Sequence, residues 1–283
     1  MSRVTLNVFI YKTFKCPHYS DKRLRLKMQW QTVSNYQEMS QVAATRIYNL
    51  IANASSRNRR INIGLATGNT MIELYNILAD KLNRHQIKLN NLHTYNLDEY
   101  IDDSGSIITE NHPLSYRKYM KEIFFSRLDT SLGFKNSQIH FPDAREPADF
   151  DRELAGVGGL DFQLLGIGFN GHIAFNEPAK INCEDFAELP SRIVALTALT
   201  LDTNARLTAD GRLDIVPHRA VTMGMKSILN AREILLLACF REQTQALRQM
   251  RQEKKATPEL PASYLITHSN STVVYTFDKI KLD

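Results

Sequence analysis

Cysteine, tryptophan and long apolar runs are all scarce in this sequence of 283 residues. It has three Cys and one Trp, and the cysteines are too widely spaced for a zinc-binding pair or a disulfide framework. The longest apolar run covers residues 234–240, far short of the roughly 18 residues that cross a bilayer. No small-residue cleavage pattern follows the apolar residues near the N-terminus, so we expect no signal peptide. We therefore expect a reduced, cytoplasmic protein with no membrane partner.

An excess of positive charge is also missing from most of the chain. The formal net charge is +5, but residues 1–28 hold seven cations and one anion, so the other 255 residues sum to about −1. A nucleic-acid binder needs its cations on one folded face, so we expect no nucleic-acid partner. We interpret residues 29–283 as the functional domain and residues 1–28 as a basic N-terminal extension. One hypothesis is that this extension is an upstream translation artefact or a loosely attached segment. The alternative is a basic arm with its own partner.

Short apolar runs alternate with helix-period stretches after residue 29, which is typical of a parallel sheet covered by helices. The apolar runs predict strands over residues 61–66, 93–97, 162–167, 234–239 and 272–277. The helical spacing predicts helices over residues 32–52, 71–82, 115–128 and 243–251. No repeat or linker interrupts the pattern. The sequence therefore predicts an α/β fold, a single Rossmann-like domain with an open, mostly parallel sheet and helices on both faces.

Polar clusters follow three of these strands, and ligands in open α/β sheets bind at the carboxyl ends of strands. The first cluster is Thr67, Gly68, Asn69 and Thr70, which opens a helix. Its N–H groups and hydroxyls, with the positive end of the helix dipole, suit an anion such as phosphate. The glycine-lysine pattern of a nucleotide-binding loop is absent. The alternative is that the polar residues only cap the helix.

The second cluster is a pair of adjacent carboxylates, Asp98 and Glu99. Neighbours on an extended strand point to opposite sides, so at most one of them faces a shared pocket. That one could shuttle a proton next to a C–H bond, while the other braces a neighbouring loop. A solvated turn or a helix cap is the alternative for such a pair.

The third cluster, residues 164–178, has the sequence LLGIGFNGHIAFNEP and is the most informative. Glycines at a strand end let the backbone approach a ligand closely. His172 follows them directly, and Glu177 lies five residues later, within reach of the imidazole. A His held by a carboxylate is the usual proton shuttle near neutral pH, whereas a core His bonded to a carbonyl is the alternative. No second His or Cys stands at ligand spacing, so we expect no metal.

This segment resembles the signature of the glucosamine-6-phosphate deaminase and galactosamine-6-phosphate isomerase family, and the resemblance extends over about residues 29–280. Residues 261–270 are similar to the galactosamine-type members in particular. Several motifs in the family's order make the resemblance specific. They are GLATGNTMIELY at 64–75, YNLDEY at 95–100, NHPLSY at 111–116, TMGMKSILNAREILLL at 222–237 and PASYLITHSN at 261–270.

The resemblance implies an aldose–ketose isomerisation of a 2-amino-2-deoxy-hexose 6-phosphate with loss of ammonia, and it implies no cofactor. Asp98 would be the base that moves a proton from C2 to C1. His172 would open the pyranose ring, positioned by Asn170 and Glu177. The remaining residues implied to bind substrate are Thr67, Gly68, Asn69, Thr70, Gly171 and Arg206.

Two departures from the family pattern bear on the substrate. Arg206 matches a phosphate-binding Arg only with a short deletion, and Gln243 stands where the family has a phosphate-binding Lys, with Arg241 nearby. The stretch 180–189 is longer and more acidic than in glucosamine enzymes, which leaves the sugar open.

Other functions fit the same fold. One is a lactonase for phosphorylated sugars, although residues 173–178 here read IAFNEP, and residues 98–100 read DEY, where lactonases have other runs. A sugar-phosphate sensor without catalysis is the other. The sequence leaves the oligomeric state open between a monomer and a homo-oligomer.

Overall fold

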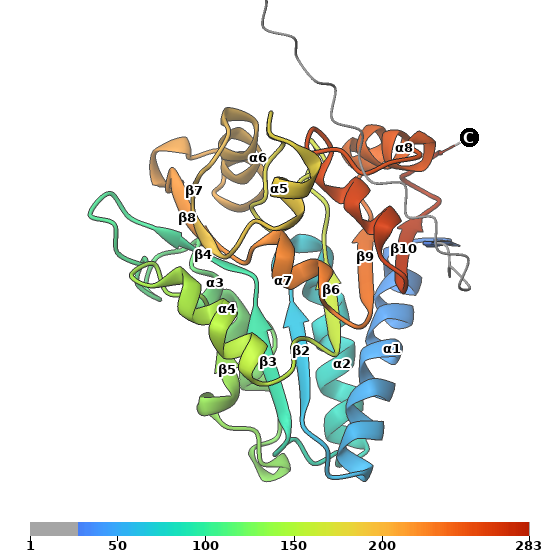
Figure 1. The fold of residues 1–283 in the computed structure, drawn as a ribbon. Helices are drawn as coiled ribbons and strands as arrows, with labels where there is room; N and C mark the ends of the chain where they lie inside the picture. Colours follow the sequence, from blue (N-terminus) through green and yellow to red (C-terminus); the bar gives the residue numbers. More distant parts are fainter. Residues whose placement is uncertain (1–27, 283) are drawn as a thin grey trace, which may run out of the picture.

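A sheet of seven parallel strands forms the centre of the protein within residues 28–282, which are the residues that the computed structural model describes. The strands follow the spatial order β1-β10-β9-β6-β2-β3-β5, and all neighbours are parallel (Figure 1). The predicted single-domain α/β fold is therefore confirmed. The strands of this sheet are β1 Gln29–Val33, β2 Ile61–Leu65, β3 Leu92–Asn96, β5 Ile139–His140, β6 Phe162–Leu165, β9 Ile234–Ala238 and β10 Ser271–Thr276. Apart from Met28, the predicted basic extension lies outside the described residues and stays a prediction.

Helices follow the strands in two runs that move across the sheet in opposite directions. The chain passes from β2 through β3 to β5, and then returns through β6 and β9 to β10. Because such crossovers are right-handed, the helices of the two runs cover opposite faces. Figure 1 shows α4 and α7, from the returning run, in front of the strands. The helices are α1 Tyr36–Ser56, α2 Ile72–Arg84, α3 Tyr116–Ile123, α4 Pro147–Gly156, α5 Cys183–Ala187, α6 Ala198–Thr208, α7 Met225–Leu229 and α8 Thr244–Gln252.

The described chain also forms a second, smaller sheet, which the sequence reading missed. It is antiparallel, in the order β4-β8-β7 (β4 Asp98–Ile101, β7 Arg192–Ala195, β8 Arg219–Thr222). The chain leaves the main sheet after β3 and enters β4 at Asp98, which pairs with Thr222. The carboxylate pair thus begins a new strand instead of ending the previous one. The missed strands are short, and β7 is only half-buried. They therefore lack the apolar runs that identify a core strand.

The N-terminal helix begins later than the pattern predicts, because residues 29–33 form an edge strand. In that strand Thr32 pairs with Tyr275 and Val33 with Thr276. The helix starts after Asn35, whose side chain accepts a hydrogen bond from the Glu38 N–H. A β-branched pair followed by an Asn cap favours this boundary.

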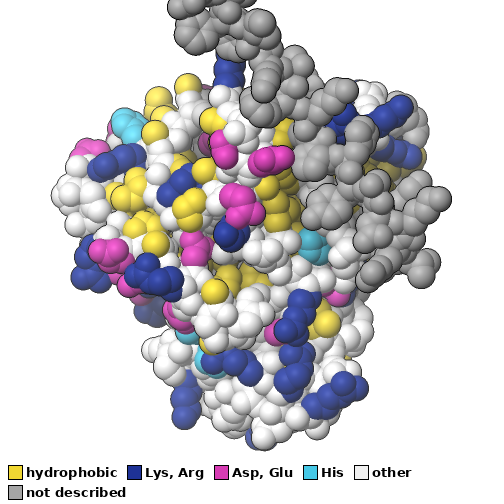
Figure 2. Space-filling model, viewed as in Figure 1, with side chains coloured by type: hydrophobic (Ala, Val, Ile, Leu, Met, Phe, Trp, Pro, Cys, Tyr) yellow, Lys and Arg dark blue, Asp and Glu magenta, His cyan; other side chains and the backbone are white. Residues whose placement is uncertain are grey.

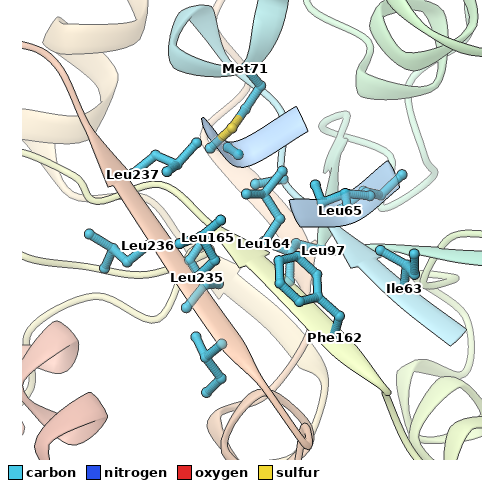
Figure 3. Close-up of a cluster of buried hydrophobic side chains, with 14 of the residues drawn as sticks. Ile63, Leu65, Met71, Leu97, Phe162, Leu164, Leu165, Leu235, Leu236 and Leu237 are labelled. Carbon is cyan, nitrogen blue, oxygen red and sulfur yellow. The ribbon is translucent and has the colours of Figure 1, made fainter. Parts of the chain in front are cut away.

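The apolar core lies around the central strands, which are buried along their whole length. Figure 3 shows side chains of β6 and β9 packed against Ile63 and Leu65 of β2 and against Met71. Full burial of a Leu or Phe side chain stabilises the folded protein by about 1.5–3 kcal/mol relative to leaving it exposed. This core fixes the positions of the strand ends at which the polar clusters lie.

Charges of both signs are interspersed on the surface drawn in Figure 2. Within residues 28–282, no helix combines the length and the apolar character needed to span a bilayer.

Candidate active site

A cavity of about 460 Å³ opens where the two runs of the chain diverge. Strands β2 and β6 are neighbours, but their connections lead in opposite directions, to β3 and to β9. The loops at their carboxyl ends therefore separate and leave a crevice. Residues 67–70 after β2 and residues 166–170 after β6 line the cavity together with Asp98 and His172. Its volume suits a ligand of small-molecule size.

The turn after β2 forms one end of the cavity, because Thr67, Gly68, Asn69 and Thr70 all line it. Gly68 has φ 101°, a conformation that favours glycine. Its carbonyl accepts hydrogen bonds from the Tyr119 hydroxyl at 2.8 Å and from the Met71 N–H at 2.9 Å. A 3-10 turn and then α2 follow, so the positive end of a helix dipole faces this end of the cavity. The geometry suits an anion.

Cationic side chains are missing from this end of the cavity. Among the described residues that line it there is no Lys or Arg. Arg206 lies outside the lining, with 54% of its side chain exposed, and its Nη1 is 3.7 Å from Oε1 of Glu242. The structure therefore places Arg206, which the resemblance implies binds phosphate, on α6 beside the cavity.

Gln243, at the position of the family's Lys, lines the cavity but is engaged by the backbone. Its Oε1 accepts hydrogen bonds from the N–H groups of Cys239 and Phe240, both at 2.9 Å, and its Nε2 donates to the Ile167 carbonyl at 2.8 Å. Gln243 therefore connects the loop after β9 to the loop after β6. This side chain organises the cavity wall and adds no charge.

The two adjacent carboxylates of β4 point to opposite sides. Asp98 lines the cavity, whereas Glu99 binds the N-terminus of α3. Glu99 accepts hydrogen bonds from the N–H groups of Tyr116 at 2.9 Å and Arg117 at 2.8 Å, and from the Ser115 hydroxyl at 3.0 Å. Burial raises the pKa of Glu99, and these hydrogen bonds oppose the rise. Glu99 thus holds α3 in place beside the cavity.

Asp98 has the environment of a general base. Its side chain is buried, and burial, followed by the nearby charge of Glu99, raises its pKa well above the ordinary value. A carboxylate with a raised pKa accepts a proton more readily once it is ionised. Tyr100, two residues along the same strand face, also lines the cavity. The period of two along β4 identifies Tyr100 as a site residue, which the sequence reading did not name.

The ring of His172 is held on one side by Asn170 and Glu177. Nδ1 lies 2.8 Å from Asn170 Oδ1 and 3.4 Å from Glu177 Oε2, and Asn170 Nδ2 donates to the same carboxylate oxygen at 2.7 Å. Since both neighbours of Nδ1 are acceptor oxygens, Nδ1 carries the hydrogen. Nε2 is then the nitrogen that can exchange a proton with a ligand.

Glu177 lies behind this ring and outside the lining of the cavity. Burial alone would raise its pKa, but hydrogen bonds from His172, Thr200 and Asn170, with the charge of His172, lower it to about 2. Glu177 is therefore ionised at every pH of interest and stabilises a protonated His172.

Gly171 has a structural position, not one in the cavity lining. Its φ is 85°, and a Cβ there would lie 2.3 Å from Leu260 Cδ1. This close packing contact is one that only glycine permits, and the predicted contact of Gly171 with substrate stays a prediction.

Helix α6 supplies cavity residues that the sequence reading missed. Thr200 and Asn204 line the cavity, and the Asn204 amide donates to the Tyr100 hydroxyl at 2.7 Å. Tyr116 and Phe175 complete an aromatic wall with Tyr100. The motifs NHPLSY and YNLDEY contain both tyrosines, whereas no local signal identifies residues of α6.

The chemistry available to these side chains is proton transfer. Within residues 28–282, no group of three or more His, Cys, Asp or Glu side chains is placed to hold a metal ion. A buried carboxylate and a carboxylate-held imidazole face one cavity, and the turn of residues 67–70, whose geometry suits an anion, closes its end. The fold and the site thus define a Rossmann-like enzyme for proton transfer on a small anionic substrate.

The chain belongs to the glucosamine-6-phosphate isomerase/6-phosphogluconolactonase family, whose model matches residues 34–275. A glucosamine-6-phosphate deaminase of Geobacillus sp. (strain WCH70) is 37% identical over 255 residues, covering 88% of this chain and 93% of the relative. One of Pseudoalteromonas translucida (strain TAC 125) is 36% identical over 262 residues, 90% of each chain.

Solved structures agree with this family. A monomeric glucosamine-6-phosphate deaminase superposes with a TM-score of 0.79 at 30% identity, covering 90% of this chain and all of that one. The 6-phosphogluconolactonase of Trypanosoma cruzi has a TM-score of 0.66 at 17% identity, covering 90% of this chain and 96% of its own. At that identity the second likeness extends to the fold alone.

Proposed function

We propose that this protein converts an amino-hexose 6-phosphate and water into a ketohexose 6-phosphate and ammonia. One observation carries the proposal: a single cavity is lined by the buried Asp98, by His172 and by the turn of residues 67–70. Asn170 and Glu177 hold the His172 ring in place. Relatives above 30% identity named as glucosamine-6-phosphate deaminases support it. The turn would hold the phosphate, with Arg206 beside it.

Ring opening would be the first step. His172 takes the proton of the anomeric hydroxyl at Nε2 and delivers it to the ring oxygen, so the C1–O5 bond breaks and an aldehyde forms. The ionised Glu177 stabilises the imidazolium that exists between the two transfers. Asn170 fixes the ring orientation that both transfers require.

Isomerisation and deamination would follow at C1 and C2. Asp98 removes the C2 proton, and the electron pair of that bond forms the C1–C2 double bond while the carbonyl pair moves to O1. O1 takes a proton from the ammonium group at C2, and the product is an enolamine. The acid then returns the proton to C1, which leaves an iminium at C2. Water adds to this carbon and ammonia departs. The aldehyde is the electron sink for the first transfer, so a carboxylate suffices as base.

The segments that suggest a galactosamine-type sugar lie outside the lining of the cavity. Helix α5, in the acidic stretch, packs on residues 261–267: the Phe186 and Tyr264 rings lie 5.2 Å apart, and the Tyr264 hydroxyl donates to the Cys183 carbonyl at 2.9 Å. The two segments therefore pack against one another outside the cavity. Because glucosamine and galactosamine differ at C4, the residues that face C4 of the bound sugar would select between them.

Ammonia release tests the proposal. Purified protein is incubated with glucosamine 6-phosphate and, separately, with galactosamine 6-phosphate and 6-phosphogluconolactone. We expect ammonia from at least one amino sugar and none from Asp98→Asn. Hydrolysis of the lactone without ammonia from either sugar would instead assign the lactonase reaction.

We infer a cytoplasmic location from the substrate. Hexose phosphates carry charge that a bilayer does not pass, so their enzymes act in the compartment where they form. Fractionation of cells that express the tagged protein tests this, and activity outside the cytoplasmic fraction would contradict it.

A further inference from the structure

One face of α6 contacts three separate parts of the active site. Thr200, Asn204 and Leu207 stand at positions i, i+4 and i+7, so they form a single stripe on the helix. Asn204 donates to the Tyr100 hydroxyl, near the base. The Leu207 carbonyl accepts from the Asn69 amide at 3.2 Å, in the anion-binding turn. Thr200, the first residue of the stripe, contacts Glu177, the carboxylate that holds His172.

The Thr200 hydroxyl donates to Oε1 of Glu177 at 2.5 Å. The other carboxylate oxygen, Oε2, faces His172 and Asn170. Thr200 is 4% exposed, so water has little access to replace this donor. Its own oxygen accepts a hydrogen bond from the Thr197 hydroxyl at 3.1 Å, and this contact fixes the direction of its proton toward Glu177.

We propose that Thr200 is a positioning residue for ring opening, whose hydroxyl fixes the Glu177 carboxylate so that Oε2 stays aligned with His172. The inference rests on the proposed function, because ring opening is the step that needs His172. A carboxylate held at one oxygen only can rotate about its χ3 bond, which is a soft torsion. With Thr200 on Oε1 and Asn170 on Oε2, that rotation is blocked at both ends.

The test compares Thr200→Val, which keeps the shape and removes the hydroxyl, with Thr200→Ser, which keeps the hydroxyl. We expect Thr200→Val to lower kcat about 10-fold, part of the 10²–10⁴-fold that a positioned acid–base group supplies. KM should change less than about twofold. Thr200→Ser should restore most of the kcat. Asp202→Asn, on the exposed side of α6, is the control and should behave like wild type.

A second measurement needs no turnover. Carbon-13 NMR of labelled Glu should give a Glu177 pKa in Thr200→Val that lies above the wild-type value of about 2, because a donor to the carboxylate is lost. Thr200→Ala should give the same result, and it replaces Thr200→Val if that variant does not fold.

The outcomes separate the two proposals. Wild-type protein that releases no ammonia would remove the proposed function, while the NMR titration still decides whether Thr200 holds Glu177. An unchanged Glu177 pKa, or a Thr200→Val enzyme with wild-type kcat, would overturn the role of Thr200. A kcat loss that Thr200→Ser does not restore would also overturn it, since packing alone would then be responsible.

Discussion

The imidazole of His172 lies directly against the α-carbon of Gly168. A Cβ built on Gly168 would be 2.2 Å from Cε1 and 2.4 Å from Nδ1 of that ring, far closer than any real contact. The Gly168 N–H also donates to the His172 carbonyl at 3.0 Å, so backbone and side chain of the two residues are joined. The ring therefore occupies the space that the Cβ of any other residue at position 168 would fill.

Gly168→Ala should therefore disable the site while the fold persists. The methyl group would push the ring away from Asn170 and Glu177, and we expect kcat to fall by about 10²-fold or more, the contribution of a general acid–base group. The unfolding transition should stay cooperative and close to that of wild type. Gly156→Ala is the matched control: nothing lies within 4 Å of a Cβ there, and Ala favours a helix by about 0.5–1 kcal/mol. Equal activity of the two variants would contradict this role for Gly168.

Much of the fold is predictable because the central strands are continuous apolar runs. Such runs predict strands over residues 162–167 and 234–239, and the structure has β6 and β9 there. The smaller sheet lacks such a signal, since β7 alternates between half-buried and exposed residues. Its pairing depends on tertiary contacts that no local pattern records.

The candidate site was predictable where its residues follow one another along the chain. His172, Asn170 and Glu177 lie in a single segment, so sequence alone brings them together. Thr200 approaches Glu177 from 23 positions away, and only the folded chain reveals that contact.

Asp98→Asn should abolish turnover and raise the stability of the folded protein. Because the folded-state pKa of Asp98 is raised, its ionised form is a cost at neutral pH that Asn does not carry. In a domain of this size each kcal/mol gained raises Tm by about 2 °C. The gain should shrink as pH falls through the raised folded-state pKa toward 3.8, the ordinary value, and vanish below it, where Asp98 is protonated in both states. Thermal unfolding at several pH values measures it; a Tm below that of wild type at neutral pH would contradict the prediction.

The neighbouring substitution Glu99→Gln should act in the opposite direction. Glu99 accepts hydrogen bonds from Ser115, Tyr116 and Arg117 at the start of α3, and an amide cannot accept at both ends. We expect a loss of about 1–3 kcal/mol of unfolding free energy, the usual effect of leaving buried donors without a partner. Urea unfolding measures it, and equal stability of the two variants would show that the carboxylates do not differ in role.

The acid limb of the pH–rate profile should belong to Asp98. The base must be ionised to take the C2 proton, so kcat/KM should fall with a slope of one as pH drops through its raised pKa. Burial and the nearby Glu99 place that limb above 3.8, whereas Glu177, with a pKa of about 2, stays ionised throughout. Glu177→Gln should lower the rate but keep the position of the limb. A limb at or below pH 3.8, measured by initial rates of ammonia release in buffers of constant ionic strength, would exclude Asp98 as its source.

Glu242→Gln should tighten the binding of phosphate by releasing Arg206. Both side chains are about half exposed, and such surface pairs contribute only about 0–1 kcal/mol, so an incoming phosphate can compete with Glu242 for the guanidinium. We expect Glu242→Gln to lower KM and the inhibition constant of inorganic phosphate by about 2–5-fold, and Arg206→Ala to raise both about 10-fold or more.

The matched control for this pair is Glu110→Gln, which breaks the exposed Lys121–Glu110 ion pair of 3.0 Å outside the cavity lining. That variant should leave both constants unchanged. No Lys or Arg among the described residues lines the cavity, and Arg206 lies beside it. The phosphate constants should therefore depend on Arg206 more than they would in a site with a lysine at position 243. Arg206→Ala with wild-type constants would remove this residue from the proposed phosphate site and leave the neutral turn of residues 67–70 as its proposed binding element.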